Sequence, residues 1–239
     1  MAKKICLDAG HYGKVNKSPA VPAYYESEMN WKLHILLKKE LESYGFEVIQ
    51  TRSAQASDLE VYARGAASKG CDLFLSLHSN AVVSGVDENT DYPVAIVQLD
   101  GKGNALGEKL AECVEAVMGT KGDGRTWQRK GSNGEYYGVL RGAAAVGTMG
   151  IILEHSFHSN TRSTKWLLDD SNLAKLAAAE AKVIAEHYGM SKKATNTESK
   201  VIYRVQVGAF SNKAYADAML AKVKAAGFKD AFIATSSKG

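Results

Sequence analysis

Cysteine and long apolar runs are both scarce in this 239-residue chain, and each scarcity excludes a class of protein. The three cysteines, Cys6, Cys71 and Cys113, lie far apart inside apolar runs, so the sequence predicts neither a CxxC metal site nor a disulfide framework. They are typical of buried thiols in a reducing compartment. No run of about 18 apolar residues occurs, which excludes a membrane-spanning helix.

Targeting signals and nucleic-acid-binding motifs are missing as well. The first residues, MAKKICLDAGHYG, pass straight into a short apolar strand, with no hydrophobic signal region and no small-residue cleavage site. We therefore expect synthesis in the cytoplasm without a signal peptide. Nothing resembles a helix-turn-helix or a zinc finger, so neither a nucleic acid nor a membrane is predicted as a partner.

Charge is unevenly distributed along a chain whose composition, with 45% hydrophobic and 23% charged residues, is otherwise that of an ordinary globular protein. Residues 191–239 contain nine Lys or Arg against three Asp or Glu, a net charge of +6. Residues 1–190 contain 21 against 23, a net charge of −2. A basic tail of this kind suits contact with a polyanion, and an anionic cell-wall polymer is one.

Residues 1–189 alternate between strand-like and helix-like periodicity, the pattern of a layered α/β domain. We expect a twisted, mixed, mostly parallel sheet flanked by helices. The predicted strands are 3–10, 46–52, 71–80, 94–99 and 147–157. The predicted helices are 28–45, 59–70, 104–119 and 172–189, and the first and last of them stop at a glycine.

The composition changes after this domain. Residues 190–200, MSKKATNTESK, have no large apolar residue beyond Met190 and predict a linker. Residues 201–239 then predict one small β-α-β unit, with strands over 201–210 and 228–235 around a helix over 212–227. Such a unit is too small to bury a core of its own.

Four chemically reactive side chains stand at or just after the ends of predicted strands, or at a helix start, where layered α/β proteins place their sites. His78 ends an apolar strand in LSLHSNA, and His11 lies between two glycines in LDAGHYG. Glu26 opens the first long helix, where a carboxylate also suits the helix dipole and where Glu28 competes for the same role. Glu154 directly follows Ile151, Ile152 and Leu153, and burying an unpaired carboxylate there would be costly.

These residue types together match a known chemistry. Two imidazoles and one carboxylate, with one position left for water, form the ligand set of a catalytic zinc site. A second glutamate that binds no metal can take a proton from the attacking water and return it to the leaving group. The four residues would supply both parts, but they are spread along the chain, so their spacing alone does not establish a site.

Four blocks in order resemble the zinc-dependent N-acetylmuramoyl-L-alanine amidases of the amidase-3 family, found in bacterial autolysins and phage endolysins. They are LDAGHYG, ESEMNWKL, the stretch from Thr51 to Ala81, and GIILEHSFHSN, within a resemblance that spans roughly residues 3 to 188. The resemblance implies that His11, Glu26 and His78 hold Zn²⁺ and that Glu154 is catalytic, with Asn80 shaping the loop beside the metal. Two departures, Tyr12 for a glycine of GHGG and EHSFHSN for ElGFlSN, alter the rim of the site.

The tail resembles the start of a SPOR-type repeat, a peptidoglycan-binding module, through YRVQVGAFSNKAYADAMLAKVKAAGF. Only half of the usual β-α-β-β-α-β module is present, and the alternative is a decaying or truncated extension. Because half a module leaves strand edges and apolar side chains uncovered, we expect a homodimer that forms through residues 201–235.

The resulting hypothesis is a zinc hydrolase that cleaves the amide between N-acetylmuramic acid and L-alanine of peptidoglycan. Two alternatives are a zinc carboxypeptidase acting on stem peptides and a wall-binding protein without catalysis. Release by a holin or by lysis of the cell would bring the enzyme to the wall.

Glu28 and His34 are expected on the helix surface or in the core, and Arg64 and Arg141 steady either the domain or the stem peptide. His155 and His158 either touch substrate or line the rim.

Overall fold

The computed structural model describes residues 3–132, 134–192 and 205–235. The chain divides into two compact units, Met1–Ala194 and Thr195–Gly239, and each is described by itself. Most of the predicted linker, residues 193–200, and the first four residues of the predicted strand 201–210 lie outside the described residues.

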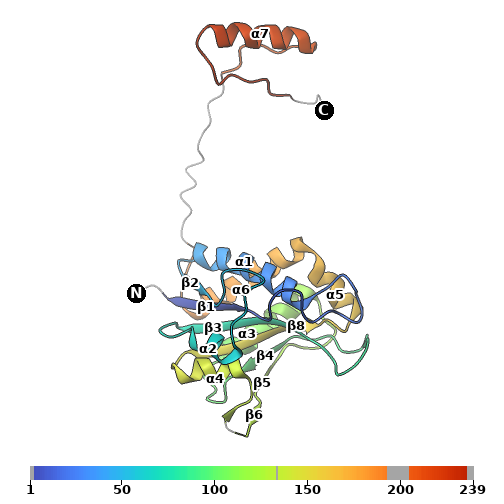
Figure 1. Cartoon of the computed structure of the whole chain (residues 1–239), viewed down its shortest axis with the longest axis vertical. Helices are drawn as coiled ribbons and strands as arrows, with labels where there is room; N and C mark the ends of the chain where they lie inside the picture. Colours follow the sequence, from blue (N-terminus) through green and yellow to red (C-terminus); the bar gives the residue numbers. More distant parts are fainter. Residues whose placement is uncertain (1–2, 133, 193–204, 236–239) are drawn as a thin grey trace. The chain divides into compact units, whose positions relative to one another are not determined.

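A six-stranded sheet forms the centre of the first unit (Figure 1). Its strands, in spatial order, are β2 (Glu47–Gln50), β1 (Lys4–Ala9), β3 (Leu73–Asn80), β8 (Met149–Phe157), β4 (Val94–Val97) and β5 (Arg125–Trp127). All neighbouring strands pair in parallel except β8 and β4, which are antiparallel. The prediction of a mixed, mostly parallel sheet is therefore confirmed.

Helices cover both faces of this sheet. They are α1 (Glu26–Ser43), α2 (Val61–Ala66), α3 (Asn104–Met118), α4 (Gly138–Ala145), α5 (Thr161–Leu168) and α6 (Asp170–His187). The structure adds β5, α4, α5 and a short hairpin of β6 (Lys130–Gly131) and β7 (Gly134–Glu135) to the predicted elements. These additions have two to eight residues each, too few for a hydrophobic period to be recognised in the sequence.

The strands bury side chains on both faces, because residues alternate along each strand. Leu73, Leu75 and Leu77 of β3 join the larger core, which the apolar faces of α1, α3 and α6 cover. Phe74 and Ile152 point to the other face, where they pack with Leu140 of α4. Since both faces are covered, the central strands read as nearly continuous apolar runs.

Helices α2 and α4 approach each other unusually closely, and glycines permit it. A Cβ atom on Gly65 would overlap the backbone of Val139, and one on Gly142 would overlap the backbone of Tyr62. This close pair lies on the same side of the sheet as the smaller core.

The second unit contains α7 (Lys213–Ala225), which begins where the Asn212 side chain accepts a hydrogen bond from the Ala214 amide at 2.9 Å. The helix was predicted correctly. The flanking strands were not, because the described parts of both predicted strands, residues 205–210 and 228–235, form no strand pairing. A strand needs a neighbour to satisfy its backbone groups, and neither segment has one within the described residues. Among the described helices of the chain, none is long and apolar enough to cross a membrane.

Candidate functional site

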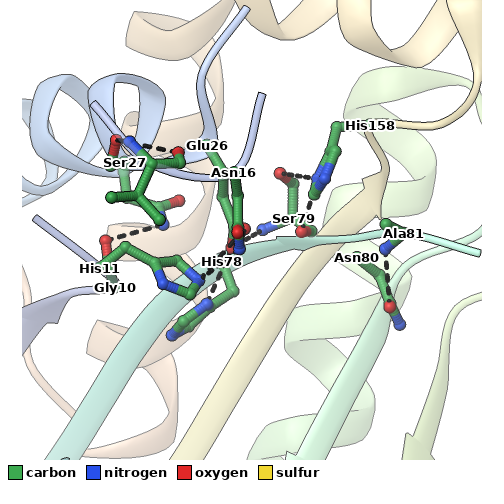
Figure 2. Close-up of polar contacts among 12 residues, drawn as sticks. Gly10, His11, Asn16, Glu26, Ser27, His78, Ser79, Asn80, Ala81 and His158 are labelled. Atoms are coloured by element: carbon green, nitrogen blue, oxygen red, sulfur yellow. Dashed lines mark hydrogen bonds and ion pairs between the residues drawn. The ribbon is translucent and has the colours of Figure 1, made fainter. Parts of the chain in front are cut away.

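One edge of the sheet gathers the four candidate residues. Strands β1, β3 and β8 run in parallel, so their carboxyl ends meet at this edge, and β3 and β8 place His78 directly opposite Glu154. His11 lies just beyond the end of β1, and the first turn of α1 brings Glu26 between the two histidines (Figure 2). The topology therefore assembles residues that are up to 143 positions apart in the sequence.

The loop after β1 is fixed from two sides. The Gly10 amide donates to the Leu77 carbonyl at 3.1 Å, and the Asn30 side chain of α1 donates to the Gly10 carbonyl at 3.2 Å. A Cβ atom on Gly10 would overlap the imidazole of His78, so only glycine lets the two segments approach this closely. His11 itself has a left-handed backbone with φ of +59°, which turns its side chain toward Glu26.

The Glu26 carboxylate is the centre of the site and is 2% exposed. One oxygen, Oε1, lies 2.8 Å from Nδ1 of His78 and accepts from the Ser79 amide at 3.0 Å. The other, Oε2, accepts from the Asn16 side chain at 2.8 Å and lies 3.2 Å from Nε2 of His11. The two imidazole rings are 5.0 Å apart between centroids and nearly perpendicular.

The two buried glutamates of the site have opposite pKa shifts. Burial alone would raise the pKa of Glu26, but hydrogen bonds from His11 and His78 outweigh it and hold that pKa well below its usual value. Burial raises the pKa of Glu154 well above its usual value, and the negative charge of Glu26 adds to this effect. Such a divergence between neighbouring carboxyl groups is typical of sites that divide binding and proton transfer between them.

The donor atoms of the site suit a metal ion. Among the described residues, His11, Glu26 and His78 each offer one ligand atom, and these atoms all lie within 4.8 Å of one another. Two imidazoles and a carboxylate match the donor set of a catalytic zinc site, which keeps a further position open. Beside them, Oε2 of Glu154 is buried and has no hydrogen-bond partner within the part of the chain that the structure describes.

The other candidates of the sequence analysis lie elsewhere. Glu28 points away from the cluster, 3.8 Å from Lys14, and lines a separate hollow of about 230 Å³. His34 is buried in the core, and burial lowers its pKa to about 4. Arg64 is buried and donates to the Leu59 carbonyl and to Asp58, both at 2.7 Å, a structural role. Arg141 is exposed and donates to the carbonyls of the loop before α4.

His158 and Asn80 shape the rim of the site. His158 is 5% exposed, and its Nδ1 donates to the Ser79 carbonyl at 2.8 Å. Its ring stacks on Tyr24, whose hydroxyl is 2.7 Å from the Ser79 hydroxyl. Asn80 closes the end of β3, because its side chain accepts from the Ala81 amide and its carbonyl accepts from the His158 amide. His158 therefore belongs to the wall of the site, whereas His155 does not.

Two residues of the site carried no recognisable signal in the sequence. Asn16 contacts both His11 and Glu26, and it holds a left-handed φ of +56° that asparagine tolerates better than most residues. Tyr24 is completely buried next to His158. Both lie in the segment KVNKSPAVPAYY, between the first sequence block and α1.

A cleft of about 510 Å³ opens over the cluster. His11, Glu26, His78 and Glu154 line it together with Lys17 and the segment from Ala81 to Gly85. Its volume suits a ligand larger than a single amino acid. The fold and this cleft define a layered α/β protein with a candidate metal-dependent hydrolase site at the carboxyl edge of its sheet.

Comparison with known protein families agrees with a metal-dependent hydrolase and identifies the family. The family model of N-acetylmuramoyl-L-alanine amidase matches residues 5–186, and that of the SPOR domain matches residues 199–239. The chain belongs to the N-acetylmuramoyl-L-alanine amidase family, as the ordered sequence blocks predicted.

Individual proteins of known sequence or structure are similar to this chain. N-acetylmuramoyl-L-alanine amidase CwlM of Bacillus licheniformis is 26% identical over 228 residues, which cover 94% of this chain and 82% of that protein. The catalytic domain of the amidase CwlV of Bacillus (Paenibacillus) polymyxa has a TM-score of 0.66 at 20% identity, covering 79% of this chain and 99% of that chain. CwlD of Clostridioides difficile, solved with the GerS lipoprotein, also has a TM-score of 0.66 at 20% identity, covering 78% and 98%.

The contact between Gly10 and His78 generates a first prediction. Gly10→Ala should displace the His78 imidazole and reduce zinc bound per chain to well below that of the wild type, as measured by metal analysis of the purified protein. Gly13→Asn is the matched control in the same loop, because a side chain at Gly13 meets no atom within 4 Å and asparagine tolerates its φ of +55°. Unchanged zinc content in Gly10→Ala would show that the close approach is not required.

Proposed function

We propose that this chain hydrolyses the amide bond between the lactyl group of N-acetylmuramic acid and L-alanine in peptidoglycan. In this proposal His11, Glu26 and His78 hold a zinc ion, and Glu154 is the general base and then the general acid. The observation that carries it is the cluster of three ligand atoms beside a buried carboxylate oxygen without a partner, in a member of the amidase family.

The residues of the site support different parts of this chemistry. When bound, zinc supplies Lewis-acid chemistry, which polarises a carbonyl group and makes water more acidic. Glu26 is suited to hold a cation, because its carboxylate is buried, ionised and already oriented by four contacts from neighbouring groups. The Ser79 amide, which a metal does not replace, keeps one carboxylate oxygen in place.

Glu154 is suited to move a proton. Its Oε2 atom takes a proton from the attacking water and passes it to the nitrogen of the leaving L-alanine, so the reaction is balanced without another acid or base. The raised pKa helps Glu154 to retain the proton between these two steps. Glu154 becomes easier to ionise once a bound cation compensates the negative charge of Glu26.

The SPOR-like unit is proposed to attach the enzyme to peptidoglycan, which places its action at the cell wall. Exposed apolar side chains in this unit include Val205, Val207, Phe228 and Phe232, and the last two are 69% and 75% exposed. A second copy of the unit would cover such side chains and pair with the unpaired segment 205–210. We therefore retain the proposal that the chain is a homodimer through residues 201–235.

Zinc binding is tested by removing one ligand at a time. His78→Ala should lose most of the bound zinc, because a site with two remaining ligands binds the ion far more weakly, whereas Glu28→Ala should keep it. Metal analysis after dialysis measures the zinc content of both variants. Equal loss in the two variants would mean that the wrong glutamate of α1 has been chosen.

The reaction is tested with purified cell walls. The wild type should release new L-alanine amino termini and leave the glycan strands intact, whereas a carboxypeptidase would release free amino acids from the stem peptides. Glu154→Gln should fold and bind zinc but lower the turnover by about 10² to 10⁴-fold, the range of general acid–base catalysis. A variant that retains a tenth of the wild-type rate would refute the role of Glu154.

The homodimer is tested by the mass of the chain in solution. The full chain should have twice the monomer mass at tens of micromolar, while a fragment of residues 1–190, which lacks the second unit, should be monomeric. Light scattering after gel filtration measures both masses. A monomeric full chain at that concentration would exclude the proposed dimer.

A further inference from the structure

A buried pair of ionisable side chains lies behind the proposed metal site, on the face of the sheet opposite to Glu154. His155 of β8 and Glu180 of α6 are both completely buried. Their neighbours on α6 include Leu176, Ala177 and Ala181, which belong to the larger apolar core. Neither residue lines the cleft, so the pair does not contact a substrate bound there.

Two hydrogen bonds connect this pair to the backbone of a proposed zinc ligand. The Nδ1 atom of His155 lies 2.8 Å from the carbonyl oxygen of His78, and Nε2 lies 2.8 Å from Oε1 of Glu180. A carbonyl oxygen can only accept, so Nδ1 must carry a hydrogen. The second contact then needs a proton of its own, on either Nε2 or the carboxyl group. In either case the pair is neutral as a whole, and His155 donates to the His78 carbonyl.

The connection falls where the sheet is irregular. The pairing of β3 with β8 shifts register between His78 and Asn80, and Ser156, next to His155, has a left-handed φ of +62°. Such irregularities interrupt the regular ladder and redirect side chains near active sites. The hydrogen bond from His155 restrains the backbone of His78 at the point where its side chain must reach Glu26, 2.8 Å away.

Stability alone does not account for this pair. Burying two ionisable groups is costly, and apolar residues of similar volume often stabilise a core as well or better. The cost is larger here because Oε2 of Glu180 is buried without a hydrogen-bond partner within the described residues. A polar connection that lowers stability and ends on the backbone of His78 fits a role in orienting that residue.

We propose that His155 and Glu180 are positioning residues, which act through the backbone of His78 to orient its imidazole for metal binding. The inference rests on the proposed zinc-dependent function. Loss of such supporting partners typically weakens metal binding by about 10 to 100-fold. The measured quantity is the dissociation constant for Zn²⁺, obtained with the full chain by competition with a chromophoric chelator, beside the thermal unfolding of the same samples without metal.

Three variants separate orientation from packing. Glu180→Leu should weaken zinc binding by about 10 to 100-fold. Glu180→Gln should bind zinc nearly as the wild type does, because its amide can donate to Nε2 of a neutral His155. Leu176→Ala, on the same helix and completely buried, is the control, and it should unfold at a lower temperature with an unchanged zinc affinity.

The double variant His155→Leu with Glu180→Leu gives the clearest test. It should unfold at a temperature equal to or above that of Glu180→Leu, because the imidazole that Glu180→Leu leaves buried without a partner at Nε2 is removed, but its zinc binding should remain weak. Wild-type zinc affinity in either Glu180→Leu or the double variant would overturn the inference, and so would equal weakening in Leu176→Ala. If the wild type itself binds no zinc, the proposed function fails instead.

A measurement on the unchanged chain covers the case in which these variants do not fold. Nitrogen-15 NMR of the histidine side chains should show a slowly exchanging hydrogen on Nδ1 of His155, as donation to the His78 carbonyl requires. A His155 ring without a hydrogen on Nδ1 would overturn the inference without any mutation.

Discussion

Burial of the Glu26 carboxylate is the constraint on which the site depends. An ionised carboxylate cannot be buried unless its oxygens are compensated, and here the compensation comes from two separate segments of the chain. The loop after β1 contributes His11 and Asn16, and the end of β3 contributes His78 and the Ser79 amide. One side chain at the start of α1 thereby ties the helix to two strands of the sheet. The same contacts that satisfy it also bring together the three atoms suited to hold a metal.

Glu154 shows how the same edge creates the opposite environment for a second carboxyl group. It emerges from β8 directly opposite His78, but its Oε2 atom receives no hydrogen bond among the described residues. Burial and the nearby charge of Glu26 therefore raise the pKa of Glu154, whereas hydrogen bonds lower that of Glu26. Two residues of one type thus acquire different chemistry from their surroundings, one suited to binding a cation and the other to carrying a proton.

The rim of the site is formed by the end of β3, the residues just beyond β8 and the segment before α1. Near the register shift between β3 and β8, His155 contacts Glu180 of α6, whereas His158 lines the cleft. The segment before α1 contributes Asn16, Lys17 and Tyr24 to the site or its wall. The segment before α1 therefore forms part of the wall of the cleft.

Local pattern was sufficient for much of this protein. Long periodic segments predicted the parallel strands and the long helices of the first unit, because each buries a continuous apolar face that is visible in the sequence. The helix α7 was predicted too, although the structure buries none of its residues. The ordered blocks identified the family and pointed to His11, Glu26, His78 and Glu154. Short elements such as β5 and α5 escaped prediction. The described parts of the two predicted tail strands, residues 205–210 and 228–235, form no strand, because pairing depends on a neighbour that local sequence does not specify.

Tertiary structure alone decided which residues meet. Glu26 and Glu28 are the same residue type and lie two positions apart at the start of α1. Because a helix turns about 100° per residue, only Glu26 faces the two histidines. Likewise, the sequence offered both His155 and His158 as rim residues. In the structure, the alternation of β8 directs His155 into the core, where it contacts Glu180. The sequence by itself determined the elements and the family, whereas the direction of each side chain followed from how those elements pack.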